Sequence, residues 1–272
     1  MKMLRKILTV ALLALAVCAC QREPRLVIIH TNDTHSHFEP IRSGADAGRG
    51  GVIERAAFID SVRNAVGEDK VLLLHAGDFC QGTSYFSELG GQLEPRIINA
   101  LRYDCVTLGN HEFDNGIEDL EGRLALLENT KVVSSNIDVS QFGLADYVKP
   151  YVILERGGMK IGVIGLESNL SANVSAVTSS RIPQLDDVEV TNRWAEYLHD
   201  TEKCDFIILL SHAGYDADQK IVPQTRYLDI VIGGHSHTFV DDFLYVRDLD
   251  GRKVPIITDG CFGVEMGEIK VY

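Results

Sequence analysis

The chain has 272 residues, of which 45% are apolar, and a formal net charge of −13. A chain of this length and composition buries one sizeable core, so it is most simply interpreted as one α/β domain. The excess of acidic residues argues against a general surface for nucleic acid or anionic membranes, so any site for a phosphate group must create its own local positive charge.

The first 20 residues differ in composition from the rest. They combine a basic start, an apolar stretch and the ending "VCAC", which is typical of a secretory signal peptide and too short for a comfortable membrane span. Because Ala19 precedes Cys20, the ending resembles a bacterial lipobox. We therefore expect a signal peptide over 1–20, a lipid-bearing Cys20 at the mature N-terminus, a short tether over 21–25, and an exported protein anchored to a membrane of the bacterial cell envelope. Plain secretion with an incidental cysteine is the alternative.

Short apolar runs alternate with helical periodicity along the mature chain, the pattern expected when helices cover a sheet. Strands are predicted over 26–30, 71–75, 105–108, 132–136, 151–155, 160–164, 206–211, 230–233, 244–247, 254–258 and 268–271. Helices are predicted over 52–66, 93–101, 117–127 and 188–203. Gly157, Gly158 and Gly251 predict tight hairpin turns. No linker divides residues 26–272, which are therefore predicted to form one domain.

Polar residues follow five of the predicted strands. The stretches "HTNDTHSH", "AGDFCQG", "GNHEFDNG", "HAG" and "GHSH" come at the ends of the strands that begin at 26, 71, 105, 206 and 230. The carboxyl ends of strands in α/β sheets line one edge, so these residues should converge there. Each stretch alone could be an ordinary loop or turn. Together they indicate a divalent metal site, because carboxylate, imidazole and amide oxygen are suitable ligands for hard or borderline metals.

These positions carry a resemblance to a known family. The motifs "DTH", "GD", "GNHE", "SH" and "GHSH", which begin at Asp33, Gly77, Gly109, Ser211 and Gly234, resemble the signature of calcineurin-like dinuclear metallophosphoesterases. The longer stretches "HTNDTHSHF", "GDFCQGT", "TLGNHEFDNG" and "IGGHSHT" are similar to the 5′-nucleotidase branch, which includes periplasmic UDP-sugar hydrolases. The resemblance covers nearly the whole mature chain. It implies that residues 26–272 form a four-layer α/β/β/α sandwich of two mixed sheets covered by helices.

The resemblance also implies a centre of two divalent metal ions with Asp78 as the bridging ligand. One ion would be held by Asp33, His35, Asp78 and His237. The second would be held by Asp78, Asn110, His212 and His235. This mixed ligand set suits manganese, zinc, cobalt or iron and does not distinguish among them. Because Asp33 and His35 are alternate residues, we expect both to point toward one ion as the chain leaves the sheet.

A catalytic group of Asn110, His111 and Asp114 is implied in the same way. His111 would stabilise charge on the transferring phosphoryl group, and Asp114 would orient its imidazole. Capping of the following helix is the alternative role for Asp114. Two divalent ions outweigh two carboxylates, so the centre would attract a phosphate dianion. A bound water with a pKa lowered to roughly 7 would then attack directly, without a phosphoenzyme.

Other polar side chains near the motifs receive smaller roles. Glu112 is expected to lie behind the site, His30 and His75 in the core, and Asn136 at the rim of the cleft. Cys80 is treated as a loop residue whose role stays open. The cysteines that follow the predicted signal peptide are too sparse for a disulfide framework.

Length is the main departure from the family pattern. Family 5′-nucleotidases usually continue into a second domain that holds the nucleoside, whereas this chain stops at "GEIKVY". We therefore expect a catalytic domain that works alone with broad specificity or with a separately encoded C-terminal specificity-domain protein. The predicted function is hydrolysis of 5′-nucleotides to nucleoside and phosphate. The alternatives are a 2′,3′-cyclic nucleotide phosphodiesterase, a UDP-sugar hydrolase or related ester hydrolase and, in another class, a non-catalytic metal- or partner-binding lipoprotein.

Overall fold

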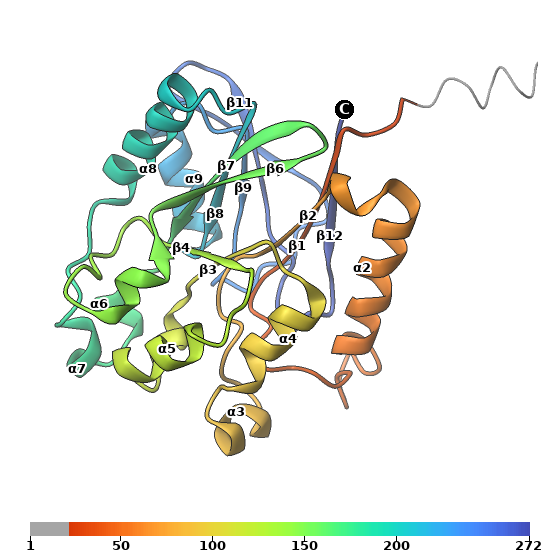
Figure 1. Cartoon of the computed structure of the whole chain (residues 1–272), viewed down its shortest axis with the longest axis vertical. Helices are drawn as coiled ribbons and strands as arrows, with labels where there is room; N and C mark the ends of the chain where they lie inside the picture. Colours follow the sequence, from red (N-terminus) through yellow and green to blue (C-terminus); the bar gives the residue numbers. More distant parts are fainter. Residues whose placement is uncertain (1–21) are drawn as a thin grey trace, which may run out of the picture.

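The computed structural model describes residues 22–272, so the predicted signal peptide, the lipid-bearing Cys20 and the first residue of the tether lie outside it. Two six-stranded mixed sheets pack face to face, and helices cover their outer faces (Figure 1). The predicted four-layer α/β/β/α architecture is therefore confirmed. No helix within 22–272 combines the length and the apolar character needed to cross a membrane.

The first sheet has the strand order β12-β1-β2-β3-β4-β5, with β12 antiparallel to β1 and the other neighbours parallel. Its strands are β1 (Leu26–Thr31), β2 (Val71–His75), β3 (Cys105–Thr107), β4 (Lys131–Val133), β5 (Val148–Lys149) and β12 (Gly267–Val271). The helices against its outer face are α2 (Val52–Val66), α4 (Leu93–Leu101) and α5 (Ile117–Leu124). Val27, Ile29 and Leu73 belong to the core cluster on this side.

The second sheet has the order β10-β11-β9-β8-β7-β6, in which the two edge strands are antiparallel to their neighbours. Its strands are β6 (Tyr151–Arg156), β7 (Met159–Leu166), β8 (Phe206–Ser211), β9 (Ile230–Ile232), β10 (Leu244–Arg247) and β11 (Lys253–Ile257). Its outer face packs against α8 (Asp187–Glu196) and α9 (Tyr215–Ile221), with Leu209 and Val231 in the shared core.

A third core cluster fills the space between the sheets. Ile28 and Leu74 of the first sheet share it with Ile161 and Leu210 of the second. Central strands are thus buried on both faces, which explains why their sequences are continuous apolar runs rather than alternating ones. Because both faces of these strands are buried, polar side chains follow where the strands end. The candidate site therefore lies at the edge of the sheets.

Several element boundaries differ from the prediction. The helix predicted over 188–203 is α8 to Glu196 followed by a π-helical turn at Tyr197–Thr201, and the helix predicted over 117–127 ends at Leu124. β4 ends at Val133, and the Ser135 N–H donates to the Gly165 carbonyl of β7 in the second sheet. The elements that the sequence did not predict are β5, α3 (Ser84–Leu89), α6 (Leu170–Asn173), α7 (Ala176–Ser179) and α9. All are too short to show a clear period.

Candidate metal centre

The loops after β1, β2, β3, β8 and β9 meet at one edge, where the two sheets face each other. Their side chains form three overlapping groups whose ligand atoms lie within 4.8 Å of one another. The groups are Asp33 with His35 and His237, Asp78 with His212 and His235, and His35 with Asp78 and His111. Asn110 joins them through its neighbour, since the His111 N–H donates to Asp78 Oδ1 at 2.9 Å. The structure therefore brings six of the seven predicted ligands into these groups, and the seventh, Asn110, directly precedes His111 in the chain.

Asp33 and Asp78 are the negative centres of this cluster. Asp33 Oδ1 lies 3.4 Å from His237 Nε2, and Asp78 Oδ2 lies 3.0 Å from His212 Nε2. His35 Nε2 lies between them, 3.8 Å from an oxygen of each carboxylate. Both aspartates are at most 2% exposed. Carboxylate oxygens and imidazole nitrogens thus lie close together, an arrangement that fits divalent cations.

The orientation of two imidazoles is set by backbone carbonyls. His212 Nδ1 lies 2.6 Å from the Ala76 carbonyl and His35 Nδ1 lies 3.2 Å from that of Gln81. Donation of each Nδ1–H leaves Nε2 with a free lone pair directed into the cluster, the tautomer that metal-ligating histidines adopt. His212 Nε2 is buried, and although it lies 3.0 Å from Asp78 Oδ2, it has no partner with hydrogen-bond geometry among the described residues. A bound cation would satisfy that nitrogen.

The pKa values reflect the same concentration of negative charge. A hydrogen bond to Asp33, with a further contribution from Cys261, raises the pKa of His237 to about 10. Burial lowers the pKa of His35 and of His235, which favours their neutral forms. Burial also opposes ionisation of Asp78, yet the neighbouring His212 holds the pKa of this carboxyl below its usual range. The Asp78 carboxylate therefore stays charged and attracts cations.

The backbone reaches these positions through left-handed conformations. Five of the seven predicted ligands have positive φ: Asp33 (47°), His35 (46°), Asp78 (54°), His235 (73°) and His237 (51°). Such residues are uncommon outside glycine, and they collect at functional sites where the surrounding structure holds them. Asp33 and His35 do share one group of potential ligands, as expected, but strand alternation is not the reason. β1 ends at Thr31, and the left-handed conformations of both residues direct their side chains to the same place.

Glycines allow the loops to approach one another closely. A Cβ on Gly109 would lie 2.4 Å from Asp78 Oδ1 and 2.6 Å from His212 Nε2. Gly77 combines a φ of 84° with a Cβ position 2.6 Å from His212 Nδ1. Side chains at these two positions would displace the predicted ligands, which explains the glycine in "GD" and "GNHE".

His111 and Asp114 form a pair at the mouth of the cluster. His111 Nδ1 lies 2.8 Å from Asp114 Oδ2, and the two side chains are 32% and 31% exposed. The hydrogen bond to Asp114 raises the pKa of His111, so the imidazole tends to carry a proton. Asp114 does not cap α5, because Gly116 occupies the N-cap position of that helix. The contact to His111 is the one expected from the motif.

Comparison with known proteins agrees with this geometry. Residues 26–239 match the family described as calcineurin-like phosphoesterase. The chain belongs to this family. A human 5′-nucleotidase is 34% identical over 270 aligned residues, which cover 90% of this chain and 46% of that protein.

Two solved structures have a similar fold. A 5′-nucleotidase precursor from Thermus thermophilus superposes with a TM-score of 0.81 at 31% identity, over 89% of this chain and 50% of its own. The NAD nucleotidase of Haemophilus influenzae gives a TM-score of 0.80 at 29% identity, over 89% of this chain and 46% of its own. This calcineurin-like phosphoesterase therefore spans about half the length of the relatives it matches.

Behind the cluster, Glu112 ties two of the phosphoesterase loops together. Its buried carboxylate accepts the N–H groups of Asp78 and Gly109 at 2.9 and 2.6 Å, and that of Cys80 at 3.0 Å. Burial, reinforced by the nearby charge of Asp78, raises the pKa of Glu112 to about 8. The expectation that Glu112 lies behind the site agrees with these contacts.

Arg123 of α5 connects the same two loops from the other side. Its guanidinium donates to the Glu112 carbonyl at 2.5 Å and to Cys80 Sγ at 3.0 Å. The Cys80 sulfur is thus held by Arg123, and it is absent from the metal-competent groups of the described residues. Cys80, Cys105, Cys204 and Cys261 are all free thiols, as expected from their spacing.

The remaining singled-out residues fall outside the cluster. His30 lies 2.6 Å from Asp259 and His75 lies 2.9 Å from Thr34, both as buried core residues. Asn136 was expected to line the cleft, but it is fully buried. Its side-chain amide forms hydrogen bonds with the backbone N–H and carbonyl of Glu167.

Sequence reasoning missed several contributors next to the cluster, among them Asn32 and Phe262. Asn32 donates to Asp33 Oδ2 at 2.6 Å, and its position one residue before a predicted ligand could have indicated it. Phe262 packs its ring against His37 at a centroid distance of 4.2 Å and near His35 and His237 at 5.9 and 5.7 Å. Phe262 comes from a loop late in the chain that has no motif of its own.

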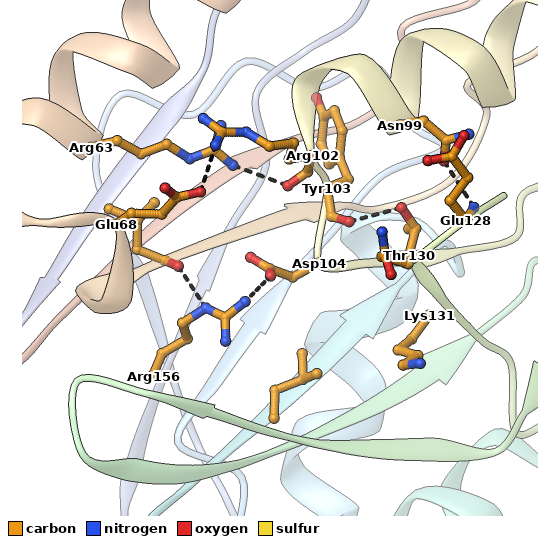
Figure 2. Close-up of a pocket in the computed structure, with 13 residues that line it drawn as sticks. Arg63, Glu68, Asn99, Arg102, Tyr103, Asp104, Glu128, Thr130, Lys131 and Arg156 are labelled. Carbon is orange, nitrogen blue, oxygen red and sulfur yellow. Dashed lines mark hydrogen bonds and ion pairs between the residues drawn. The ribbon is translucent and has the colours of Figure 1, made fainter.

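A separate cavity of about 390 Å³ lies at the opposite end of the first sheet, where β2 and β4 begin (Figure 2). Its three arginines have partners within the protein. Arg63 donates to the carbonyls of Leu101 and Arg102, and Arg102 pairs with Glu68. Arg156 pairs with Asp104, as Figure 2 shows.

Proposed function

We propose that this protein is a metal-dependent phosphoesterase that hydrolyses 5′-nucleotides to nucleoside and phosphate. The convergence of six potential ligands from four loops beside the His111–Asp114 pair carries the proposal. Membership of the calcineurin-like family and similarity to 5′-nucleotidases support it.

The proposed roles follow from the contacts. Asp33, His35, Asp78 and His237 would hold one divalent ion. Asp78, Asn110, His212 and His235 would hold the second. Bound ions supply positive charge and a water molecule of lowered pKa close to the phosphoryl group. The protein holds the ligands in place through strained loops and backbone hydrogen bonds, so little reorganisation is needed when substrate binds.

His111 is proposed to contact the phosphoryl group itself. Its side chain is the accessible member of the His35–Asp78–His111 group, and its ring centroid lies 5.2 Å from that of His35. Asp114 occupies Nδ1 and favours the protonated form, which leaves Nε2–H free to donate to a phosphoryl oxygen. The interaction strengthens as negative charge develops in the transition state.

Substrate selection is proposed to depend on residues beyond this domain. The matched relatives are about twice as long, and the chain covers 46% of the human 5′-nucleotidase. We propose that a second domain contributes contacts to the nucleoside. Hydrolysis of a pyrophosphate bond, as in a UDP-sugar hydrolase, is a second candidate because the NAD nucleotidase has the same fold and is 29% identical.

A substrate comparison tests the proposal. The soluble chain from Gln21 onward would be treated with chelator, supplied with manganese, and given AMP, UDP-glucose, a 2′,3′-cyclic nucleotide and a simple aryl phosphate. Products would be separated by anion-exchange chromatography. We expect manganese-restored hydrolysis of AMP and the aryl ester with rates within about tenfold, because the shared phosphoryl group provides the main contacts.

Two outcomes would contradict parts of this account. Strong selectivity for AMP by the isolated chain would argue against the need for a second domain. Failure to hydrolyse any of the four substrates, with manganese bound, would contradict the proposed activity.

We also propose that the protein is exported and held to a membrane by lipid on Cys20. The composition of residues 1–20 and the similarity to snake venom 5′-nucleotidases support export. Mass spectrometry of the mature N-terminus tests the anchor. A diacylglyceryl-modified Cys20 is expected, and an unmodified N-terminus at another residue would contradict it.

A further inference from the structure

Glu167 and Ser168 lie next to the second proposed ion site, although neither belongs to a motif. They follow β7 directly, and Leu166 pairs in register with Ser211 of β8. Glu167 is therefore placed beside His212, whose N–H donates to the Leu166 carbonyl at 2.8 Å. Glu167 is 0% exposed and Ser168 is 1% exposed. A carboxyl group is thus buried at the edge where the predicted ligands meet.

The backbone of Glu167 is fixed across the two sheets. Asn136, just past β4 of the first sheet, accepts the Glu167 N–H at 2.8 Å and donates to the Glu167 carbonyl at 2.7 Å. The same amide nitrogen donates to Asp187 Oδ1 at 2.8 Å. This pair of bonds holds Glu167 at a defined position relative to the loops of the first sheet, among them the loop that carries Asn110.

The Glu167 side chain reaches toward Asn110 through Ser168. Glu167 Oε1 accepts the Ser168 N–H at 2.7 Å and the Ser168 hydroxyl at 3.0 Å. Ser168 Oγ lies 3.5 Å from Asn110 Oδ1, the amide oxygen. If the Asn110 amide turned so that its oxygen faced an ion, its NH₂ group would face Ser168 Oγ and could donate to it. The hydroxyl in turn donates to Glu167, so the three groups form an ordered chain.

The second oxygen of Glu167 has no partner. Oε2 is buried and makes no hydrogen bond among the described residues. Burial raises the pKa of Glu167 to about 7, although the nearby His212 acts in the opposite direction. An uncompensated buried carboxylate is costly, so a neighbouring cation would stabilise it.

Resting on the proposed function, we propose that Glu167 is a positioning residue for the second metal ion. Through Ser168 it orients the Asn110 amide, and its free oxygen adds negative charge beside His212. It thereby raises the affinity of the second site without changing the first. Asp33, His35 and His237 are held by other contacts, so the first site should not depend on Glu167.

Equilibrium manganese binding to the chelated protein, measured by isothermal titration calorimetry, tests this inference. In Glu167→Gln, which keeps the size and one acceptor oxygen, the second dissociation constant should rise about 10–100-fold while the first stays unchanged. Ser168→Ala should also weaken the second ion, because the Asn110 amide loses its partner. Glu167→Asp, which keeps the charge, should recover part of the affinity. The exposed Glu189→Gln is the matched control and should bind as the wild type does.

The outcomes separate this inference from the proposed function. If the wild type binds two ions and both Glu167→Gln and Ser168→Ala bind them equally tightly, the positioning role is wrong. Weakening of both ions alike in variants with native near-ultraviolet circular dichroism would also overturn it, since the effect would not be specific to the second site. A wild type that binds no manganese would instead contradict the proposed function.

Discussion

Replacing His111 with alanine should lower kcat for phosphate release by about 100-fold or more, the loss expected when one transition-state hydrogen-bond donor is removed. Metal content should stay at the wild-type level, because the proposed ligand sets do not include His111. The structure supports this separation. The His111 side chain is 32% exposed at the mouth of the cluster, whereas Asp33 and His212 are fully buried. Steady-state kinetics with AMP and elemental analysis of the same samples measure the two effects.

Asp114, which contacts His111, provides a graded comparison for this variant. Asp114→Asn keeps the imidazole but removes the charge that favours its protonated form, so a smaller loss is expected. Loss of an ion from His111→Ala would place His111 among the ligands. Unchanged kcat would remove it from the catalytic group.

Replacing Asp78 with asparagine should release both ions and reduce phosphate release by at least about 100-fold. Loss of a residue that only hydrogen-bonds to a metal ligand already lowers metal affinity or activity by about 10–100-fold, and Asp78 is proposed as a ligand itself. Asp78 is shared by two of the three metal-competent groups. Its Oδ2 lies 3.0 Å from His212 Nε2 and 3.8 Å from His35 Nε2, so one substitution weakens both proposed sites. Elemental analysis after dialysis measures the metal loss.

The shape of the loop should survive this change. An asparagine oxygen can still accept the His111 N–H, and the Asp78 N–H is held by Glu112. Asp60→Asn on the exposed face of α2 is the control and should keep both ions. Retention of two ions by Asp78→Asn would show that Asp78 does not bridge.

The position of the site could be predicted from the sequence because it depends on a local pattern, namely polar residues that directly follow buried strands. A strand buried on both faces reads as an apolar run, and the first polar residues after it mark the sheet edge. Asp33, Asp78 and His212 each follow such a run, and the structure places them together. The type of fold followed from the family resemblance, since apolar runs alone do not distinguish one sheet from two.

The features that escaped prediction depend on contacts between distant segments. The left-handed conformations of Asp33 and His35 are imposed by hydrogen bonds to the loop after β2, which no local pattern reports. Glu167 and Phe262 approach the cluster only once both sheets are assembled. Short helices such as α6 are set by capping and packing rather than by a period.

The most direct test of the central claim is phosphate release from AMP as a function of manganese bound per chain, starting from chelated protein. If two ions act together around Asp78, activity should be near baseline with one ion bound, rise with the second and return to baseline on chelation. Full activity with one ion or none, or no activity with two ions bound, would contradict the account.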